Sequence, residues 1–380
     1  MNGHTKGRVW LGMAALALLM RPALADIVVG VSHSLSGPAA GLGTQFQRAM
    51  EEMPREIAGE KVRYILLDDN SDPSAAVRNV RKLVTEDHAD IILAPSTAPA
   101  AYAIAPVLAD LHVPLICTAP IEFYGDKADW LGAPLMANTS WMSVAIADMK
   151  KRGIKRVAYI GFSDTYGDQV YNALVSVAKD NGIEIVTNER FARADTSVTG
   201  QVLRILAARP DAVMVGGSTS PAALPNNALL ERNFGKPIYN TPVVVGPDFR
   251  RLVRAPKQVL SATFLLPAAR QLPDSNPVKA IAVPMVEKYE KTYGPGTADV
   301  QTGEAFDSGI LLTHMATEAL KTARPGTPEF RAALNSSLHQ VKDLPATMGF
   351  YTFRKGDPWG LDERSVVLME LVDGAWKIVQ

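Results

Sequence analysis

The chain alternates between short apolar runs and longer segments in which apolar residues recur every three or four positions. The first pattern is typical of strands buried on both faces, and the second of helices that pack one face on a sheet. Such an alternation predicts parallel sheets covered by helices. In the first part of the chain we expect strands at 27–31, 62–67, 91–94 and 114–117, and helices at 43–57, 73–85 and 99–111.

A second series of the same kind begins after Asn138. It predicts strands at 156–161, 183–189, 212–215 and 237–239, and helices at 140–152, 167–181, 198–208 and 222–234. Beyond it follow an apolar stretch at 260–266, helices at 278–293 and 303–322, and strand-like stretches at 349–353, 365–371 and 376–379. Two such series predict an α/β protein with two Rossmann-like lobes, each built on a parallel central sheet.

The first residues have the pattern of a secretory signal peptide. A basic start with Lys6 and Arg8 precedes the apolar run 9–20, and Ala23-Leu-Ala25 then provides small residues for cleavage. A membrane anchor is the alternative, but the run is too short to cross a hydrocarbon core of about 30 Å. We therefore expect cleavage after Ala25, export to the periplasm and a soluble mature protein.

Composition narrows the function further. The 39 basic and 39 acidic side chains balance, and no block of Lys or Arg offers a surface for nucleic acid or an anionic membrane. Residues 26–380 exceed what one hydrophobic core usually serves, which favours two domains. Cys117 is the only cysteine, so no intramolecular disulfide can form, and its apolar surroundings predict a buried thiol.

Two sequences resemble nucleotide or calcium motifs but lack essential residues. Gly41-Leu-Gly43 has the start of a dinucleotide fingerprint, yet Phe46 replaces its third glycine and the preceding strand ends too early. The acidic stretch 68–72 has the spacing of a calcium loop, but Pro73 stands where the sharp turn needs glycine. A helix-capping acidic turn explains that stretch better.

Metal and catalytic sites have little support either. The six histidines are scattered and have no cysteine partner, which argues against a zinc site. The stretch 216–221 lacks the closing glycine of a nucleophile elbow. We predict no catalytic residue, no metal and no cofactor. A secreted α/β hydrolase with a triad assembled only in space is the enzymatic alternative.

Five short motifs occur in one order along the chain. They are Ser34-Leu-Ser-Gly-Pro-Ala-Ala-Gly-Leu-Gly43, Ala94-Pro-Ser-Thr97, Val113-Pro-Leu-Ile116, Asp164-Thr-Tyr-Gly167 and Ala305-Phe-Asp-Ser308. Together they resemble the periplasmic Leu/Ile/Val-binding proteins of ABC transporters, and the resemblance covers nearly the whole chain after residue 25.

The resemblance implies the type I periplasmic-binding-protein fold, in which three crossovers connect the lobes. Here the crossovers are expected near Asn138, Leu266 and Gly349. The implied division is 1–25 for the signal peptide, 26–138 with 267–348 for lobe one, and 139–266 with 349–380 for lobe two.

Ser96, Thr97 and Ala98 are the first candidates for ligand binding. They follow one expected strand and precede a helix, and open α/β sheets bind ligands at the carboxyl ends of their strands. Hydroxyl groups and free backbone N–H groups at a helix N-terminus suit a carboxylate. Ordinary capping of the helix by Ser96 or Thr97 is the alternative.

Further ligand contacts follow from the resemblance. Thr118 and Ala119 match the second contact loop of lobe one, although the family usually has a Ser-Pro-Ala-like stretch there. Tyr166 matches the lobe-two tyrosine whose ring covers the ligand, and a half-buried loop tyrosine is the alternative. Ser218 and Thr219 match the next contact loop, where an aromatic residue is often found.

Asp248 resembles the acid that holds the ammonium group of an amino acid, since a buried ammonium needs a charged partner. The sequence Pro247-Asp-Phe-Arg-Arg-Leu252 also has the pattern of a helix start. Leu42 stands where many amino-acid binders have an aromatic residue. These departures leave amino acids and other aromatic or aliphatic carboxylates open as ligands.

The sequence thus predicts a monomeric, non-enzymatic binding protein that closes two lobes around a small solute. In the expected mechanism the solute docks on lobe one, and lobe two then closes over it. The closed form would be presented to the permease of an ABC importer in the inner membrane. A sensing subunit that passes the closed state to a receptor is the alternative partner arrangement.

Overall fold

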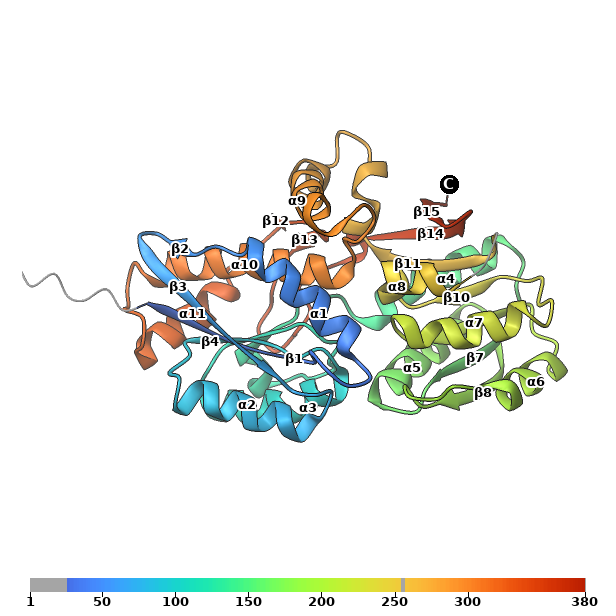
Figure 1. The fold of residues 1–380 in the computed structure, drawn as a ribbon, viewed down its shortest axis with the longest axis horizontal. Helices are drawn as coiled ribbons and strands as arrows, with labels where there is room; N and C mark the ends of the chain where they lie inside the picture. The colour runs from blue at the N-terminus through green and yellow to red at the C-terminus, as the bar shows by residue number, and fades with distance from the viewer. Residues whose placement is uncertain (1–25, 254–256, 380) are drawn as a thin grey trace, which may run out of the picture.

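Residues 26–253 and 257–379 are described by the computed structural model. They form two lobes that lie side by side, each with a central sheet and helices on both faces (Figure 1). The long helix α9 (Pro277–Tyr293) lies beside the junction of the lobes. The expected α/β class and the parallel central sheets are confirmed.

The first sheet has the strand order β2-β3-β1-β4-β5-β6, with all pairs parallel except β2 with β3. Every residue of β1 and β4 is buried, because helices cover both faces. The strands are β1 (Ile27–His33), β2 (Glu56–Ile57), β3 (Glu60–Asp68), β4 (Ile91–Ala94), β5 (Leu115–Cys117) and β6 (Leu131–Gly132), and the helices are α1 (Ala40–Ala49), α2 (Pro73–Thr85), α3 (Ala98–Asp110), α10 (Val300–Ala319) and α11 (Pro328–Leu338).

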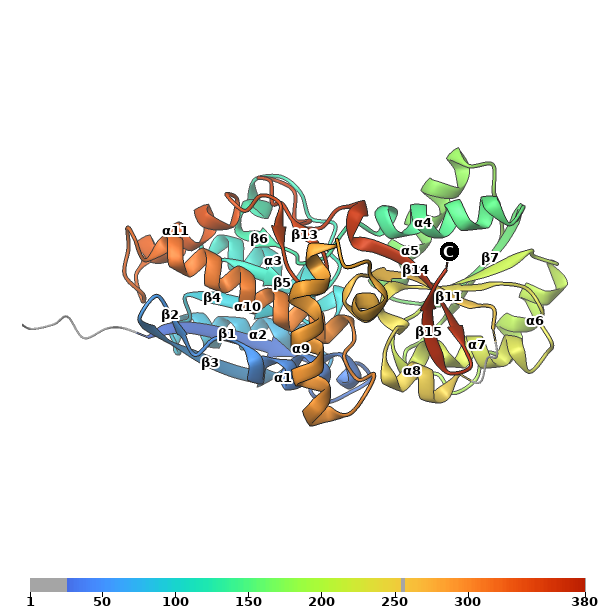
Figure 2. The ribbon, with the colours of Figure 1, turned by 90° about the horizontal axis from the view of Figure 1, so that it is seen from above.

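The second sheet has the order β15-β14-β11-β10-β9-β7-β8. Its first two strands run antiparallel to their neighbours, and the other pairs are parallel. Helices α4 and α5 lie on one face, and α7 and α8 on the other (Figure 2). The strands are β7 (Arg156–Phe162), β8 (Glu184–Phe191), β9 (Ala212–Gly216), β10 (Ile238–Asn240), β11 (Val259–Phe264), β14 (Val366–Val372) and β15 (Ala375–Ile378), and the helices are α4 (Asn138–Lys151), α5 (Thr165–Asp180), α6 (Thr199–Ala207), α7 (Ala223–Leu230) and α8 (Pro247–Leu252).

The chain passes between the two sheets three times. The hairpin of β12 (Leu344–Pro345) and β13 (Phe350–Tyr351) is followed by a segment that stays beside the first passage. There the Ala133 N–H donates to Pro358 and the Leu361 N–H to Leu135. We therefore propose the division into lobes given above, with one change: the boundary between the last segment of lobe one and the last segment of lobe two lies at residues 362–365 instead of 349.

The expected helix at 43–57 is shorter in the structure. It ends at Ala49 and continues as a 3-10 turn to Glu52. Residues 56–57 instead form β2, which pairs with β3 across a tight turn in which Ala58 and Gly59 have positive φ. The helical spacing of the apolar residues predicted a helix here, because it does not indicate the two left-handed residues on which the hairpin depends.

Asp307 joins helix α10 to the hinge-side hairpin. Its buried carboxylate accepts hydrogen bonds from the Thr347 N–H and hydroxyl, both at 2.7 Å, from the Met348 N–H at 2.9 Å and from the Tyr351 hydroxyl at 2.7 Å. Burial raises the pKa of this carboxyl, and the four donors oppose that rise. One side chain thus satisfies four polar groups that have left water.

We predict that Asp307→Ala destabilises the protein by about 3 kcal/mol or more, because it leaves buried donors without an acceptor. Urea unfolding followed by circular dichroism measures the change. The matched control is Asp274→Ala, whose side chain is 97% exposed, and we expect no measurable loss there. Equal stability of the two variants would show that the Asp307 hydrogen bonds do not hold the hinge.

Candidate functional site

A cavity lies between the lobes at the carboxyl ends of the strands, as expected for an open α/β sheet. It encloses about 340 Å³ of space between atoms, part of it open to solvent. We call it the cleft. From the side of the first sheet it is lined by Leu42, Ser96, Thr97, Ala98, Thr118, Pro120, Gln301 and Glu304, and from the side of the second by Tyr166, Arg193, Ser218 and Val243.

Six of the nine predicted ligand residues line this cleft: Ser96, Thr97, Ala98, Thr118, Tyr166 and Ser218. Ala119 is fully buried and is not part of its wall. Thr219 and Asp248 line a neighbouring cavity, which shares only Val243 with the cleft. The structure therefore brings together residues from both lobes that are far apart in the sequence.

Asp248 lies in the first turn of α8, in agreement with the helix-start pattern. Its side chain is 45% exposed and lies 3.5 Å from the guanidinium of Arg251. An exposed carboxylate gains little from an ammonium partner compared with a buried one. Its assignment to an amino-acid ammonium group stays a prediction, and the carboxyl in the cleft wall is Glu304.

Buried His33 holds two hydroxyls of the cleft. Its Nδ1 lies 2.9 Å from the Ser96 Oγ, and its Nε2 lies 3.3 Å from the Thr118 Oγ1. The Thr118 hydroxyl donates to the Pro95 carbonyl at 3.0 Å, so Nε2 is the donor in its contact with Thr118. Nδ1 is then the acceptor, and the Ser96 hydroxyl donates to it.

The two hydroxyls held by His33 have their protons directed into the protein. Ser96 Oγ in addition accepts the Ser34 N–H at 2.9 Å. A ligand carboxylate needs donors, and these remain at the N-terminus of α3. Thr97 is the N-cap of that helix, and its hydroxyl has no hydrogen-bond partner within residues 26–253 and 257–379. Among the described residues, the groups of lobe one that remain free to donate in the cleft are therefore the Thr97 hydroxyl and the backbone N–H of Ala98.

Ser96 in the cleft wall contacts a histidine, as a hydrolase would need, but the arrangement is unsuitable because His33 is buried behind the wall. Burial lowers the pKa of His33 from 6.5 to about 3, so the ring is a poor proton acceptor. The second ring nitrogen faces the Thr118 hydroxyl and no carboxylate. The contact thus lacks the third member that orients and stabilises a catalytic histidine.

Arg193 is a cleft residue that the sequence analysis missed. Its Nε donates to Asp164 at 2.7 Å and its Nη1 to Ser218 at 3.2 Å, while the guanidinium stacks 4.1 Å from the centre of the Phe162 ring. These contacts hold a cation in the wall contributed by lobe two. Its position just after strand β8 was the available signal, because polar residues at strand ends face the cleft.

The position of Tyr166 follows from its glycine neighbour. The Asp164 carboxylate caps α5 by accepting the Gly167 N–H, and a Cβ on Gly167 would overlap the Phe162 carbonyl. Only glycine allows this close approach, so the Asp164-Thr-Tyr-Gly167 motif fixes the turn that carries Tyr166 into the cleft. Burial raises the pKa of Tyr166 to about 12, so it remains a neutral phenol.

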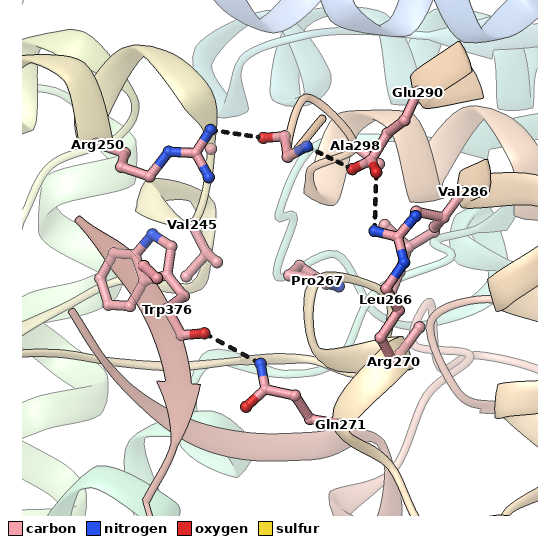
Figure 3. Close-up of a pocket in the computed structure, with 14 residues that line it drawn as sticks. Val245, Arg250, Leu266, Pro267, Arg270, Gln271, Val286, Glu290, Ala298 and Trp376 are labelled. Carbon is pink, nitrogen blue, oxygen red and sulfur yellow. Dashed lines mark hydrogen bonds and ion pairs between the residues drawn. The ribbon is translucent and has the colours of Figure 1, made fainter. Parts of the chain in front are cut away.

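A second, larger cavity lies on the hinge side of the lobes (Figure 3). Its charged groups already have partners within the protein. Arg250 donates to the Gly296 carbonyl, and the N–H of Gly296 donates to the Glu290 carboxylate. Glu290 also accepts a hydrogen bond from Arg270. These groups need no ligand to be satisfied. We therefore take the cleft, despite its smaller volume, as the candidate ligand site.

The chain matches the family described as "Periplasmic binding protein" over residues 26–375. It belongs to this family. It is 26% identical to the Leu/Ile/Val-binding protein BraC3 of Rhizobium johnstonii, over 87% of this chain and 88% of that protein. The relatives are named for binding and not for catalysis, in agreement with a non-enzymatic protein.

Solved structures agree with this membership. An extracellular ligand-binding receptor from Rhodopseudomonas palustris HaA2 is 39% identical, with a TM-score of 0.91 over 94% of this chain and 100% of that one. The branched-chain amino acid transporter substrate-binding protein LivJ of Streptococcus pneumoniae, in complex with isoleucine, is 20% identical. Its TM-score is 0.74, over 93% of this chain and 99% of that one, and it shows the shared fold.

Within the described residues no group of three or more His, Cys, Asp and Glu side chains is arranged to hold a metal ion. The same residues contain no helix with the length and apolar character needed to cross a bilayer.

The buried His33 predicts a specific dependence of stability on pH. The folded state keeps the ring neutral down to about pH 3, whereas the unfolded chain takes up a proton near pH 6.5. Above pH 6.5 the neutral His33 therefore imposes no pH-dependent penalty on folding. As the pH decreases from 6.5 towards 3, His33 lowers the free energy of unfolding by about 1.4 kcal/mol per pH unit.

We expect His33→Gln to remove this slope, since an amide does not titrate. Urea unfolding at pH 7, 5 and 4 on both proteins measures it, and the difference between them cancels the contribution of the buried acids. Parallel curves for the two proteins would mean that His33 is not held neutral by burial.

Proposed function

We propose that the protein is the periplasmic solute-binding component of an ABC importer and that it closes its lobes around a small carboxylate. The observation that supports this most is the cleft itself, because polar groups from both sheets converge on it. Thr97 and Ala98 supply anion-binding donors from one side, and Arg193 supplies a cation from the other. A negative ligand would thus be shared between the lobes.

Closure follows from that sharing. A ligand that contacts both lobes binds the closed form more tightly than the open form, so it shifts the population towards closure. Tyr166 and Ser218 then cover the solute and exclude water. The name of BraC3 supports a branched-chain amino acid as one ligand class, and the position of Asp248 outside the cleft supports acids without an ammonium group.

A screen of small acids tests the proposal. Leucine, isoleucine and valine are compared with benzoate and short aliphatic acids by thermal shift, since a ligand at 100 times its Kd adds about 2.7 kcal/mol of stability. Small-angle scattering of any complex should show a more compact particle. If no acid of the panel both binds and compacts the protein, the proposal is wrong.

We predict that Thr97→Val weakens binding of the ligand found by the screen about tenfold, because the hydroxyl is a free donor that only the ligand would use. Isothermal titration calorimetry measures the Kd. The matched control is Thr85→Val at the exposed end of α2, far from the strand ends, whose hydroxyl bonds only the Arg81 carbonyl. The same loss in both variants would point to a general effect on folding.

Two further measurements address location and partner. The mature protein recovered from the periplasm should begin at Asp26, as mass spectrometry of the intact chain would show. A permease and an ATPase encoded beside the gene would support import, whereas a receptor gene in that place would support the sensing alternative.

A further inference from the structure

A second chamber continues from the cleft towards the hinge. It shares Pro120, Tyr166, Val243 and Glu304 with the cleft, and it has about 310 Å³ of space between atoms, part of it open to solvent. We call it the distal chamber. Beyond the shared residues its wall is mainly apolar, with Asn138 as the polar exception: Leu135, Met136, Asn138, Trp141, Pro242 and Phe264.

Asn138 presents unused donors to this chamber. The side chain is 3% exposed, and its Oδ1 accepts the Trp141 indole N–H at 3.0 Å. Because that N–H can only donate, it fixes which end of the amide is the oxygen. The Nδ2 amide nitrogen is buried and has no hydrogen-bond partner among the described residues. An unsatisfied buried donor of this kind is costly for the folded protein.

Glu304 is the second unpaired polar group. It is 3% exposed, and no described residue forms a hydrogen bond with its carboxyl group. Burial, and to a smaller extent the nearby Asp299, raises the pKa of Glu304 well above its ordinary value. In its protonated form a carboxyl group can both donate and accept a hydrogen bond.

The comparison with Asp307 shows that these unpaired groups are not a general property of the helix. Asp307 lies one turn further along α10 and is equally buried, yet it accepts four hydrogen bonds from the protein. The protein thus satisfies one acid of α10 completely and leaves the other facing a chamber.

We propose that Asn138 and Glu304 form a distal subsite for a hydroxyl group of the ligand. The ligand class is then an acid whose carboxylate binds at Thr97 and Ala98 and whose body carries a hydroxyl at its far end. The hydroxyl oxygen accepts from the Asn138 amide and donates to the Glu304 carboxyl. This inference rests on the proposed function, because it assumes a carboxylate in the cleft.

Chemistry at the subsite disfavours the other polar ends. An ammonium group has no lone pair, so it leaves the Asn138 amide unsatisfied and places a positive charge against its hydrogens. A second carboxylate would face a buried acid whose neighbour Asp299 is also an acid. The aromatic rings of Trp141, Tyr166 and Phe264 suit a planar or apolar body between the two ends.

Matched pairs of acids that differ by one hydroxyl test the subsite. Phenylacetate is compared with 4-hydroxyphenylacetate, and hexanoate with 6-hydroxyhexanoate, by calorimetry at pH 7. We expect the hydroxy acid to bind about tenfold more tightly in at least one pair, because a site built around a hydroxyl leaves its polar groups unpaired when the hydroxyl is missing.

Variants assign the preference to the subsite. Glu304→Leu should reduce the ratio of the two Kd values to about one, whereas Glu304→Gln should keep most of it, since an amide still hydrogen-bonds. Ser218→Ala is the control in the cleft: it should change both Kd values of a pair alike and leave their ratio unchanged.

Equal binding of both members of every pair by the wild-type protein would overturn the subsite and leave the proposed function standing. The subsite would also be overturned if the Kd ratio of a pair were unchanged in Glu304→Leu. It would be overturned as well if leucine bound and Glu304→Gln abolished its binding, because an ionised Glu304 would then hold the ammonium group. Failure of every acid and amino acid to bind would instead remove the proposed function itself.

Discussion

The requirement that buried polar groups find partners determines how the two lobes can meet. Parallel strands end at one edge of each sheet, and the loops after these ends carry hydroxyl, amide and charged side chains away from water. Within each lobe most such groups are paired, as in the Asn226 and Asn240 amides, which bond each other at 2.8 Å. Among the groups without a partner, Thr97, Asn138 and Glu304 line the space between the lobes.

The cleft therefore has two kinds of polar residue. His33, Ser96 and Thr118 bond one another and give the wall its shape, while Thr97, Arg193 and Glu304 face the space that a ligand would fill. Whether a hydroxyl belongs to the first or the second kind depends on the atom to which it donates its proton. The Ser96 hydroxyl donates to His33 and accepts from the Ser34 N–H, and its role as a donor to the ligand stays a prediction.

Much of the fold could be predicted from the sequence, because the fully buried strands are continuous apolar runs. Strand β4 matches the expected 91–94, and α2 begins with the Asp72 cap and Pro73 as the sequence indicates. The β2 hairpin could not be predicted, since its turn depends on a left-handed alanine. Helix α11 was overlooked although Thr327-Pro328 has the same cap pattern as Asp72-Pro73.

The site was less predictable than the fold. The strand end indicated Ser96 and Thr97, because they follow an apolar run, and the family resemblance indicated Tyr166. Glu304 lies inside a helix whose first three turns are buried almost all round, so no polar face marks it as unusual. Asn138 was taken only as a boundary between lobes. Trp141, three residues later in the sequence, holds its amide oxygen, but the missing partner of its Nδ2 depends on the tertiary packing, which sequence spacing does not reveal.

Neither lobe is complete until the last part of the chain has been made. The edge of the second sheet is closed by β14 and β15, and the first sheet is covered by α10 and α11, all of which come after residue 299. A nascent chain therefore exposes apolar sheet faces until its end is synthesised. For the export proposed above, this order means that neither lobe can be finished before nearly the whole polypeptide has been made.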